Sequence, residues 1–125
     1  MPLKKNTLRH GVIVAGTLLL GAGIFFGVSA MRQQADIKAG QRVYFDHCAV
    51  CHAPDGSGVK YQGLPLMGST FMTELSDAAL KTFIKVGRLV ESPDSKMDDP
   101  MLPVDYLEEA EYDALIRYLR RMNSP

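Results

Sequence analysis

The 125-residue sequence has no tryptophan and only two cysteines, and its 14 Lys and Arg residues balance its 14 Asp and Glu residues. Alternating runs of β-branched and polar residues are also scarce, which argues against a sheet and predicts an all-α fold. No basic stripe extends beyond the N-terminal tail, so the charge pattern excludes a nucleic-acid-binding protein. A chain of this length has room for one domain.

Both cysteines stand in one pentapeptide, Cys48-Ala49-Val50-Cys51-His52. The C-x-x-C-H spacing is typical of covalent attachment of a c-type haem. Each thiol can add to one vinyl group of the porphyrin, and the histidine that follows is then held where its imidazole can ligate the iron. We therefore predict one haem c, bound through Cys48 and Cys51, with His52 as the proximal iron ligand.

Three other uses of the cysteine pair stay open. A structural zinc site needs four ligands, usually two such pairs, and the only other histidines are His10 and His47. A thioredoxin-like redox motif needs a βαβ context, which the flanking sequence lacks. A disulfide across two intervening residues closes too small a loop to stabilise the fold much.

An uncharged run extends from Gly11 to Ala30. At about 1.5 Å per residue a helix of this length matches the roughly 30 Å thickness of a bilayer's hydrocarbon core. Basic residues precede the run and place the N-terminus in the cytoplasm by the positive-inside rule. The expected organisation is therefore a basic cytoplasmic tail at residues 1–10, a transmembrane signal anchor at 11–30, a linker at 31–35 and a haem domain at 36–125.

The end of the uncharged run leaves a second interpretation open. Val28-Ser29-Ala30 offers a small-residue cleavage site, so the run can also be a cleaved signal peptide, although it is longer than the usual signal core. Gly23 and Gly27 have the G-x-x-x-G spacing that lets another transmembrane helix approach closely. Such a contact would make the protein a subunit of a membrane complex.

The expected haem domain begins with a helix at residues 37–45, for which Asp36 is the predicted N-cap. Gly40, Tyr44 and Cys48 follow one another at intervals of four residues. They therefore share one helical face, and this helix leads directly into the pentapeptide.

Two more helices are predicted after a turn-rich loop that follows the pentapeptide. Ser76 caps the first and Gly87 ends it. An extended, proline-containing loop comes next, and Asp105 with Glu108 resembles a capping box that opens a final helix to about residue 121. The apolar residues expected on the buried faces are Ala79, Leu80, Phe83 and Ile84 in the first helix and Leu107, Ala114, Leu115, Tyr118, Leu119 and Met122 in the second.

With these features, residues 36–121 resemble a class I (monohaem) cytochrome c. In that family a glycine and an aromatic residue on the first helix cross the last helix at a hydrophobic and an aromatic residue. Gly40 and Tyr44 match the first pair, and Leu115 and Tyr118 match the second. The resemblance implies the cytochrome c fold, in which three to four short helices surround one covalently bound haem.

The resemblance also implies a partner for the histidine ring. The family has a proline downstream of the haem histidine whose carbonyl oxygen accepts the second ring N–H. Pro65, 13 positions after His52, matches that proline. Such a bond would fix the ring and raise its donor strength.

For the sixth iron ligand, residues 87–103 are similar to a subgroup of these cytochromes, in which Gly-Arg and Pro-Asp pairs precede the ligand methionine. Met101 lies at the matching distance and has apolar neighbours, although Leu102 stands where the subgroup has a proline. Met97 is the alternative, but charged residues flank it. The predicted metal ligands are therefore His52 and Met101.

An iron with both axial positions filled exchanges electrons and has no open site for a substrate. We therefore expect an electron-transport protein rather than an enzyme, a single-pass protein of the bacterial inner membrane with its haem domain in the periplasm. It would carry single electrons to or from a membrane redox complex, as a subunit of it. The alternatives are a free shuttle after signal cleavage, a haem enzyme or gas sensor with an open iron, and a non-haem structural or assembly protein. The acidic run from Glu91 to Asp113 is either a steering surface for a basic partner or simply solvated.

Overall fold

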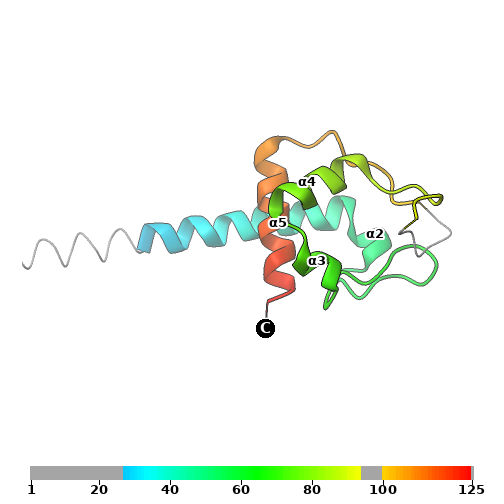
Figure 1. The fold of residues 1–125 in the computed structure, drawn as a ribbon. Helices are drawn as coiled ribbons and strands as arrows, with labels where there is room; N and C mark the ends of the chain where they lie inside the picture. Colours follow the sequence, from blue (N-terminus) through cyan, green and yellow to red (C-terminus); the bar gives the residue numbers. More distant parts are fainter. Residues whose placement is uncertain (1–26, 94–99, 125) are drawn as a thin grey trace, which may run out of the picture. The chain divides into compact units, whose positions relative to one another are not determined.

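The computed structural model describes residues 27–93 and 100–124. The chain divides into two compact units, Met1–Gln34 and Ala35–Pro125. In the first unit, residues 27–34 are helical. The second unit opens with helical residues 35–47, and its further helices are α2 (Ala49–His52), α3 (Thr70–Glu74), α4 (Asp77–Val86) and α5 (Glu109–Met122) (Figure 1).

The prediction of an all-α fold is confirmed for these residues. Within the described ranges no strand forms, and extended pairing is limited to two isolated bridges, Val59 with Gly63 and Arg88 with Met101. None of the described helices combines the length and the mean hydropathy that a membrane span requires. Most of the predicted anchor at 11–30, together with the tail at 1–10, lies outside the described residues.

The first helix of the second unit differs at its start from the prediction. Residues 31–35, expected as a linker, are helical, and Asp36 also has helical backbone. The prediction of Asp36 as N-cap is therefore wrong, because an N-cap residue lies outside the helical conformation. The Asp36 carboxylate instead lies 3.4 Å from Nε of Arg117 on α5.

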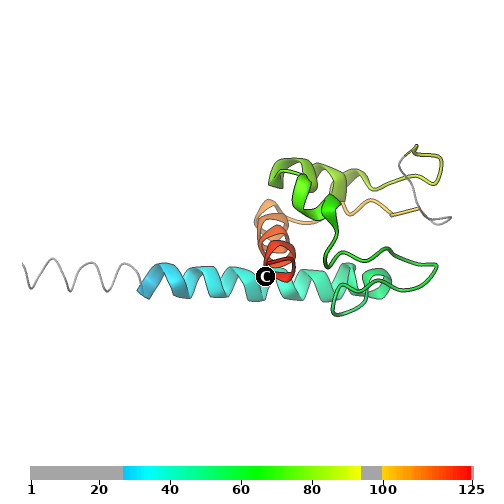
Figure 2. The ribbon, with the colours of Figure 1, turned by 60° about the horizontal axis from the view of Figure 1, so that its bottom comes forward.

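α5 crosses the helical residues 35–47, as Figures 1 and 2 both show. Gly40 faces the backbone of Ala114 and Leu115 at the crossing, and the rings of Tyr44 and Tyr118 lie 5.4 Å apart between centroids. The predicted crossing of these two helices is thus confirmed.

α4 forms where the sequence predicts it. The hydroxyl of Ser76 accepts a hydrogen bond from the Ala79 N–H at 3.2 Å, and Gly87 ends the helix with a φ of 72°. Leu80 and Ile84 are buried in the core. Ala79, which was expected on the buried face, is exposed.

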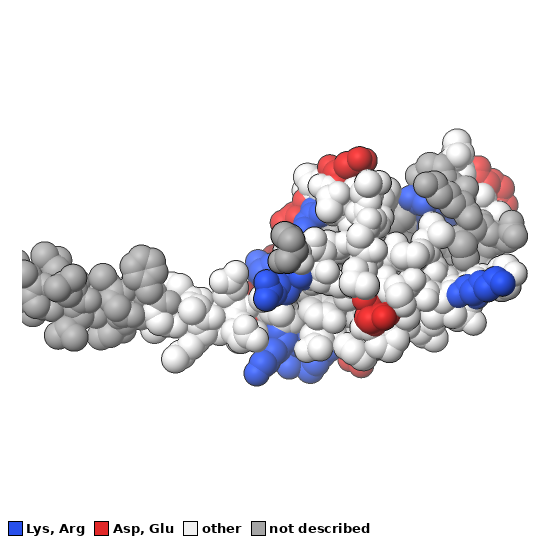
Figure 3. All heavy atoms as spheres, turned by 90° about the horizontal axis from the view of Figure 1, so that it is seen from below, with Lys and Arg blue, Asp and Glu red and all other residues white. Residues whose placement is uncertain are grey.

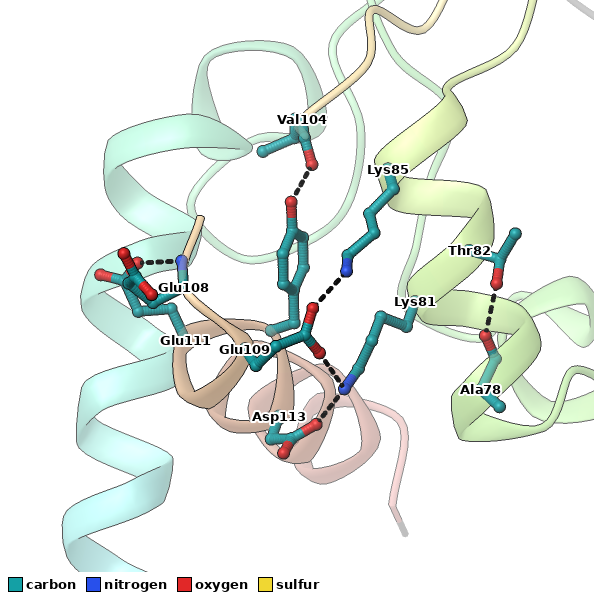
Figure 4. A network of polar contacts seen from close by, with 10 residues as sticks. Ala78, Lys81, Thr82, Lys85, Val104, Glu108, Glu109, Glu111 and Asp113 are labelled. Carbon is teal, nitrogen blue, oxygen red and sulfur yellow. Dashed lines mark hydrogen bonds and ion pairs between the residues drawn. The ribbon is translucent and has the colours of Figure 1, made fainter. Parts of the chain in front are cut away.

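The start of α5 corrects a second capping prediction. The capping box is formed by Glu108 and Glu111 rather than by Asp105 and Glu108 (Figure 4). The reason is tertiary: Val104 is buried, its N–H donates to Ile84 O at 3.0 Å, and its carbonyl accepts the Tyr112 hydroxyl at 2.6 Å. These bonds hold the chain extended ahead of the helix.

A network of ion pairs joins α4 to α5 (Figure 4). Lys81 Nζ lies 2.5 Å from Asp113 and 3.2 Å from Glu109, and Lys85 pairs with the other oxygen of Glu109. Hydrogen bonds from Lys85 and Lys81 hold the pKa of Glu109 below its usual range. The bonds to Asp113 and Glu109 likewise raise the pKa of Lys81.

The short helix α3 is not foreseen from the sequence. Met72 on α3 is 3 % exposed and fills the core. The guanidinium of Arg120 on α5 donates to the carbonyl oxygens of Met72 and Leu75, the latter at 2.5 Å, and pairs with Asp77 at 2.9 Å. One arginine therefore links α3 and the start of α4 to the last helix.

Candidate functional site

The pentapeptide continues the helix at residues 35–47 with little interruption. The N–H of Cys48 donates to the carbonyl of Tyr44 at 2.8 Å, and the N–H of His52 donates to the carbonyl of Cys48 at 2.9 Å. Residues three and four positions apart lie on one face of a helix. Cys48, which is the N-cap residue of α2, is therefore presented on the same side as Cys51 and His52.

Neither thiol is used in a disulfide, and both cysteines are half-buried. Cys48 packs against the hydrophobic core. Burial, together with the neighbouring Cys51, raises the pKa of the Cys48 thiol to about 11. A thiol in this setting stays protonated at neutral pH, which differs from the lowered pKa of a thioredoxin-like nucleophile.

The imidazole of His52 has its Nδ1 atom 2.8 Å from the carbonyl oxygen of Leu64. A carbonyl oxygen can only accept, so Nδ1 carries a hydrogen, and in the neutral form of the ring the lone pair is then on Nε2. This is the tautomer that a histidine needs to ligate a metal through Nε2, with an outer partner fixing the ring.

The acceptor of the ring N–H is Leu64 and not Pro65, which corrects the prediction from the sequence. The N–H of Leu66 donates to Gly56 O at 2.8 Å. In a trans peptide the N–H and the preceding carbonyl point in opposite directions, and no described peptide is cis. The carbonyl of Pro65 is therefore turned away from Gly56, and that of Leu64 serves the ring.

The loop after the pentapeptide, residues 53–69, folds back on Cys51. The N–H of Val59 donates to Cys51 O at 3.1 Å, and a Cβ atom on Gly63 would lie 3.1 Å from Cys51 Cβ. Gly58 has a φ of 82°, and a Cβ there would lie 2.7 Å from the carbonyl oxygen of Gly63. Only glycine permits both close approaches.

Tyr44 ties the start of the same loop to the helix before it. Its hydroxyl donates to the carbonyl of Ala53 at 2.6 Å, and Ala53 has a φ of 63°. Burial of Tyr44 raises its pKa to about 12, with a smaller contribution from Cys48. The prediction from the sequence gave Tyr44 only a packing role and missed this hydrogen bond, for which the sequence holds no signal.

Met101 is half-buried and packs against the core. Its N–H donates to Arg88 O at 2.9 Å, and its carbonyl accepts the Arg88 N–H at 2.8 Å. In Figures 1 and 2 the segment after α4 and the loop after α2 lie at the same end of the domain. Met97 lies outside the described residues, so the choice of Met101 as ligand stays a prediction.

The donor set fits a c-type haem. Two free thiols and an imidazole with an available Nε2 share one face of α2. The Nδ1 hydrogen of His52 is hydrogen-bonded to the loop at residues 53–69. This loop is in turn hydrogen-bonded to Cys51 and, through Ala53, to Tyr44. These residues therefore have the chemistry to attach a porphyrin and to ligate its iron.

Four of the six acidic residues in the described part of the run from Glu91 to Asp113 are engaged within the domain. Glu108 and Glu111 form the capping box, and Glu109 and Asp113 pair with lysines of α4. On the face drawn in Figure 3, charged side chains of both signs are scattered among uncharged ones. The described part of this run is therefore better explained by local pairing than by steering of a partner.

Comparison with known proteins gives two findings. The family model described as Cytochrome c matches residues 37–123. Among curated proteins, the chain is 26 % identical over 86 residues to "Alcohol dehydrogenase (quinone), cytochrome c subunit" of Gluconobacter oxydans (strain 621H). The aligned region covers 67 % of this chain but 18 % of that protein, so the chain spans only a small part of its relative's length.

Proposed function

Since this chain belongs to the cytochrome c family, we propose that it carries single electrons through one haem c attached to Cys48 and Cys51. The observation that supports this most directly is that α2 and its N-cap residue bring two free thiols and one imidazole to one side. When bound, a haem ligated in this way changes between ferric and ferrous iron by one electron. Family membership implies electron transfer rather than catalysis.

The two thiols supply the attachment. Each S–H would add across one vinyl double bond of the porphyrin, which forms a C–S bond, moves the hydrogen to the other vinyl carbon and requires no oxidant. Cys48 is held by its packing against the core and by its bond to Tyr44. Cys51 is held by Val59, whose N–H donates to its carbonyl.

His52 would hold the iron through Nε2. Its Nδ1–H donates to Leu64 O, which fixes the plane of the ring and raises the donor strength of the imidazole. Met101 would hold the iron as its second protein ligand; its backbone is fixed to Arg88 and its side chain packs against the core. With both positions filled, the iron would be closed to external ligands.

For the membrane, the proposal is that residues 11–30 anchor the chain in the bacterial inner membrane, with the haem domain in the periplasm. The uncharged run and the basic residues before it support this. The name of the Gluconobacter relative describes a subunit of a dehydrogenase. We extend this to a partner class for this chain, a membrane redox complex of which it is the electron-accepting or electron-donating subunit.

The haem proposal is tested by the intact mass of the protein and by haem staining of a denaturing gel. Protein from cells that mature c-type cytochromes should be heavier than the bare polypeptide by one haem and should stain. Cys48→Ser together with Cys51→Ser should abolish both signals, and Ser57→Ala in the nearby loop should leave both unchanged. A bare polypeptide mass in the unsubstituted protein would refute the proposal.

The membrane part needs a separate experiment. Purification from membranes in mild detergent should retain the full chain and bring an oxidoreductase with it. Recovery of a shortened chain from the periplasmic fraction would instead favour the free shuttle released by signal cleavage.

A further inference from the structure

The orientation of the His52 ring depends on a loop without regular structure. Residues 53–69 form no helix or strand, apart from the isolated bridge of Val59 with Gly63. The ring N–H nevertheless reaches into this loop, to Leu64 O at 2.8 Å. The position of the loop therefore decides how the imidazole is held, in addition to the helix that carries it.

Hydrogen bonds to Gly56 join the first half of this loop to the second. Its carbonyl oxygen accepts the N–H of Leu66 at 2.8 Å and the N–H of Met67 at 3.0 Å. Leu64 lies two residues before the first of these donors. A displacement of residues 66–68 would therefore be passed to the carbonyl that binds the imidazole.

The end of α5 contacts both halves of the loop through two consecutive residues, Met122 and Asn123. Oδ1 of Asn123 accepts the N–H of Gly68 at 2.9 Å, while its Nδ2 donates to Leu119 O at 3.0 Å. The carboxamide is thus fixed from both sides. Met122 packs against the first half of the loop, at the buried Gly56. A Cβ atom on Gly56 would lie 3.4 Å from the methyl carbon of Met122 and even closer to the Met122 sulfur.

We infer that Asn123 is a positioning residue for His52, acting through Gly68 and the loop that carries Leu64. The inference rests on the proposed function, because the imidazole matters as an iron ligand. A lost outer hydrogen bond lowers the donor strength of a ligating histidine. A weaker donor stabilises ferric iron less, so a displaced Leu64 carbonyl raises the reduction potential.

The test compares Asn123→Ala with Ser124→Ala in the haem-loaded full chain. Ser124→Ala removes a hydrogen bond to Arg120 O at 2.9 Å in the same turn and leaves the Gly68 bond in place. In Asn123→Ala the exchange of the His52 ring N–H, followed by NMR in the reduced state, should become roughly fivefold faster. The reduction potential should rise. Asn123→Asp keeps an acceptor oxygen for Gly68 and should restore slow exchange.

Three outcomes would overturn the inference. The first is that the ring N–H exchange rate and the reduction potential of Asn123→Ala equal those of the unsubstituted protein. The second is that Ser124→Ala changes both quantities as much as Asn123→Ala does. Rapid exchange of the Gly68 amide in the unsubstituted protein would show that the Asn123 bond does not hold the loop. The intact mass of the unsubstituted protein separates this inference from the proposed function. A missing haem refutes the function. If the protein carries haem and Asn123→Ala changes neither the exchange rate nor the potential, only the positioning role is refuted.

Discussion

Gly40 and Ala114 are in backbone contact: a Cβ atom on Gly40 would overlap the carbonyl group of Ala114 and lie 2.9 Å from the amide nitrogen of Leu115. Because the obstacle is backbone on both counts, no side-chain rotation can relieve it. The helix crossing that supports the pentapeptide therefore requires glycine at this position.

Gly40→Ala should lower the free energy of unfolding. Alanine favours a helix over glycine by about 1 kcal/mol, but forcing extra volume into a packed contact costs about 1–3 kcal/mol. Because here the overlap is with backbone, we expect a packing cost at the upper end of that range and, after the helix gain of alanine is subtracted, a net loss of about 2 kcal/mol. Urea unfolding followed by circular dichroism measures it. Lys38→Ala, an exposed change on the same helix, should change stability little, and a Gly40→Ala protein as stable as that control would contradict the close crossing.

Met101→Ala should leave one coordination position of the haem iron free for an external ligand. The reduced variant is expected to bind carbon monoxide, seen as a change in its absorption spectrum, while the unsubstituted protein is not. Met67→Ala is the control, since Met67 is 50 % exposed. If Met97→Ala opens the iron and Met101→Ala does not, the ligand assignment moves to Met97.

Tyr44→Phe removes the hydroxyl that holds Ala53 and should cost about 0.5–1.5 kcal/mol of stability. It should also change the alkaline limb of the stability profile. The pKa of Tyr44 is raised from 10.0 to about 12 in the folded protein, so the unfolded chain ionises first and stability falls as pH rises through this window. The fall should be smaller in Tyr44→Phe. Tyr61→Phe, a change at a tyrosine that is 72 % exposed, should leave the profile unchanged.

Glu109→Gln tests the ion pairs between α4 and α5. The pKa of Glu109 is lowered by its lysine partners, so its contribution to stability is present above the ordinary glutamate pKa and is lost as pH falls through the lowered value. The variant should be less stable than the unsubstituted protein at neutral pH and equal to it in acid. Salt should reduce the difference at neutral pH. A difference that persists unchanged in acid, or one matched by Glu74→Gln on α3, would contradict this account.

Much of the domain could be predicted because its signals are local. The ends of α4 follow from a serine cap and a glycine stop, and both lie within a few residues of the helix they bound. The pentapeptide is equally local, since three side chains at fixed spacing carry its chemistry. The crossing of Gly40 with α5 is not local, and it was predicted only through the resemblance to a family.

The failed predictions depend on contacts between distant segments. Asp105 matches a capping box in the sequence, but Val104 bonds to Ile84 and keeps the chain extended there. Tyr112 is fully buried although it was not expected on the inner face of α5. Pro65 lies in the loop that supplies the acceptor for the His52 ring, but the accepting carbonyl is that of Leu64. Gly56 O accepts the N–H of Leu66, which fixes the peptide between Pro65 and Leu66 and turns the Pro65 carbonyl away from Gly56.

The crossing of residues 35–47 with α5 also sets an order of events during biogenesis. Synthesis from the N-terminus produces both cysteines before Ala114 and Leu115. Until then, Gly40 has nothing to pack against. The segment that carries the two thiols is thus without its crossing helix until residues 109–122 have been made, and only then can the domain close.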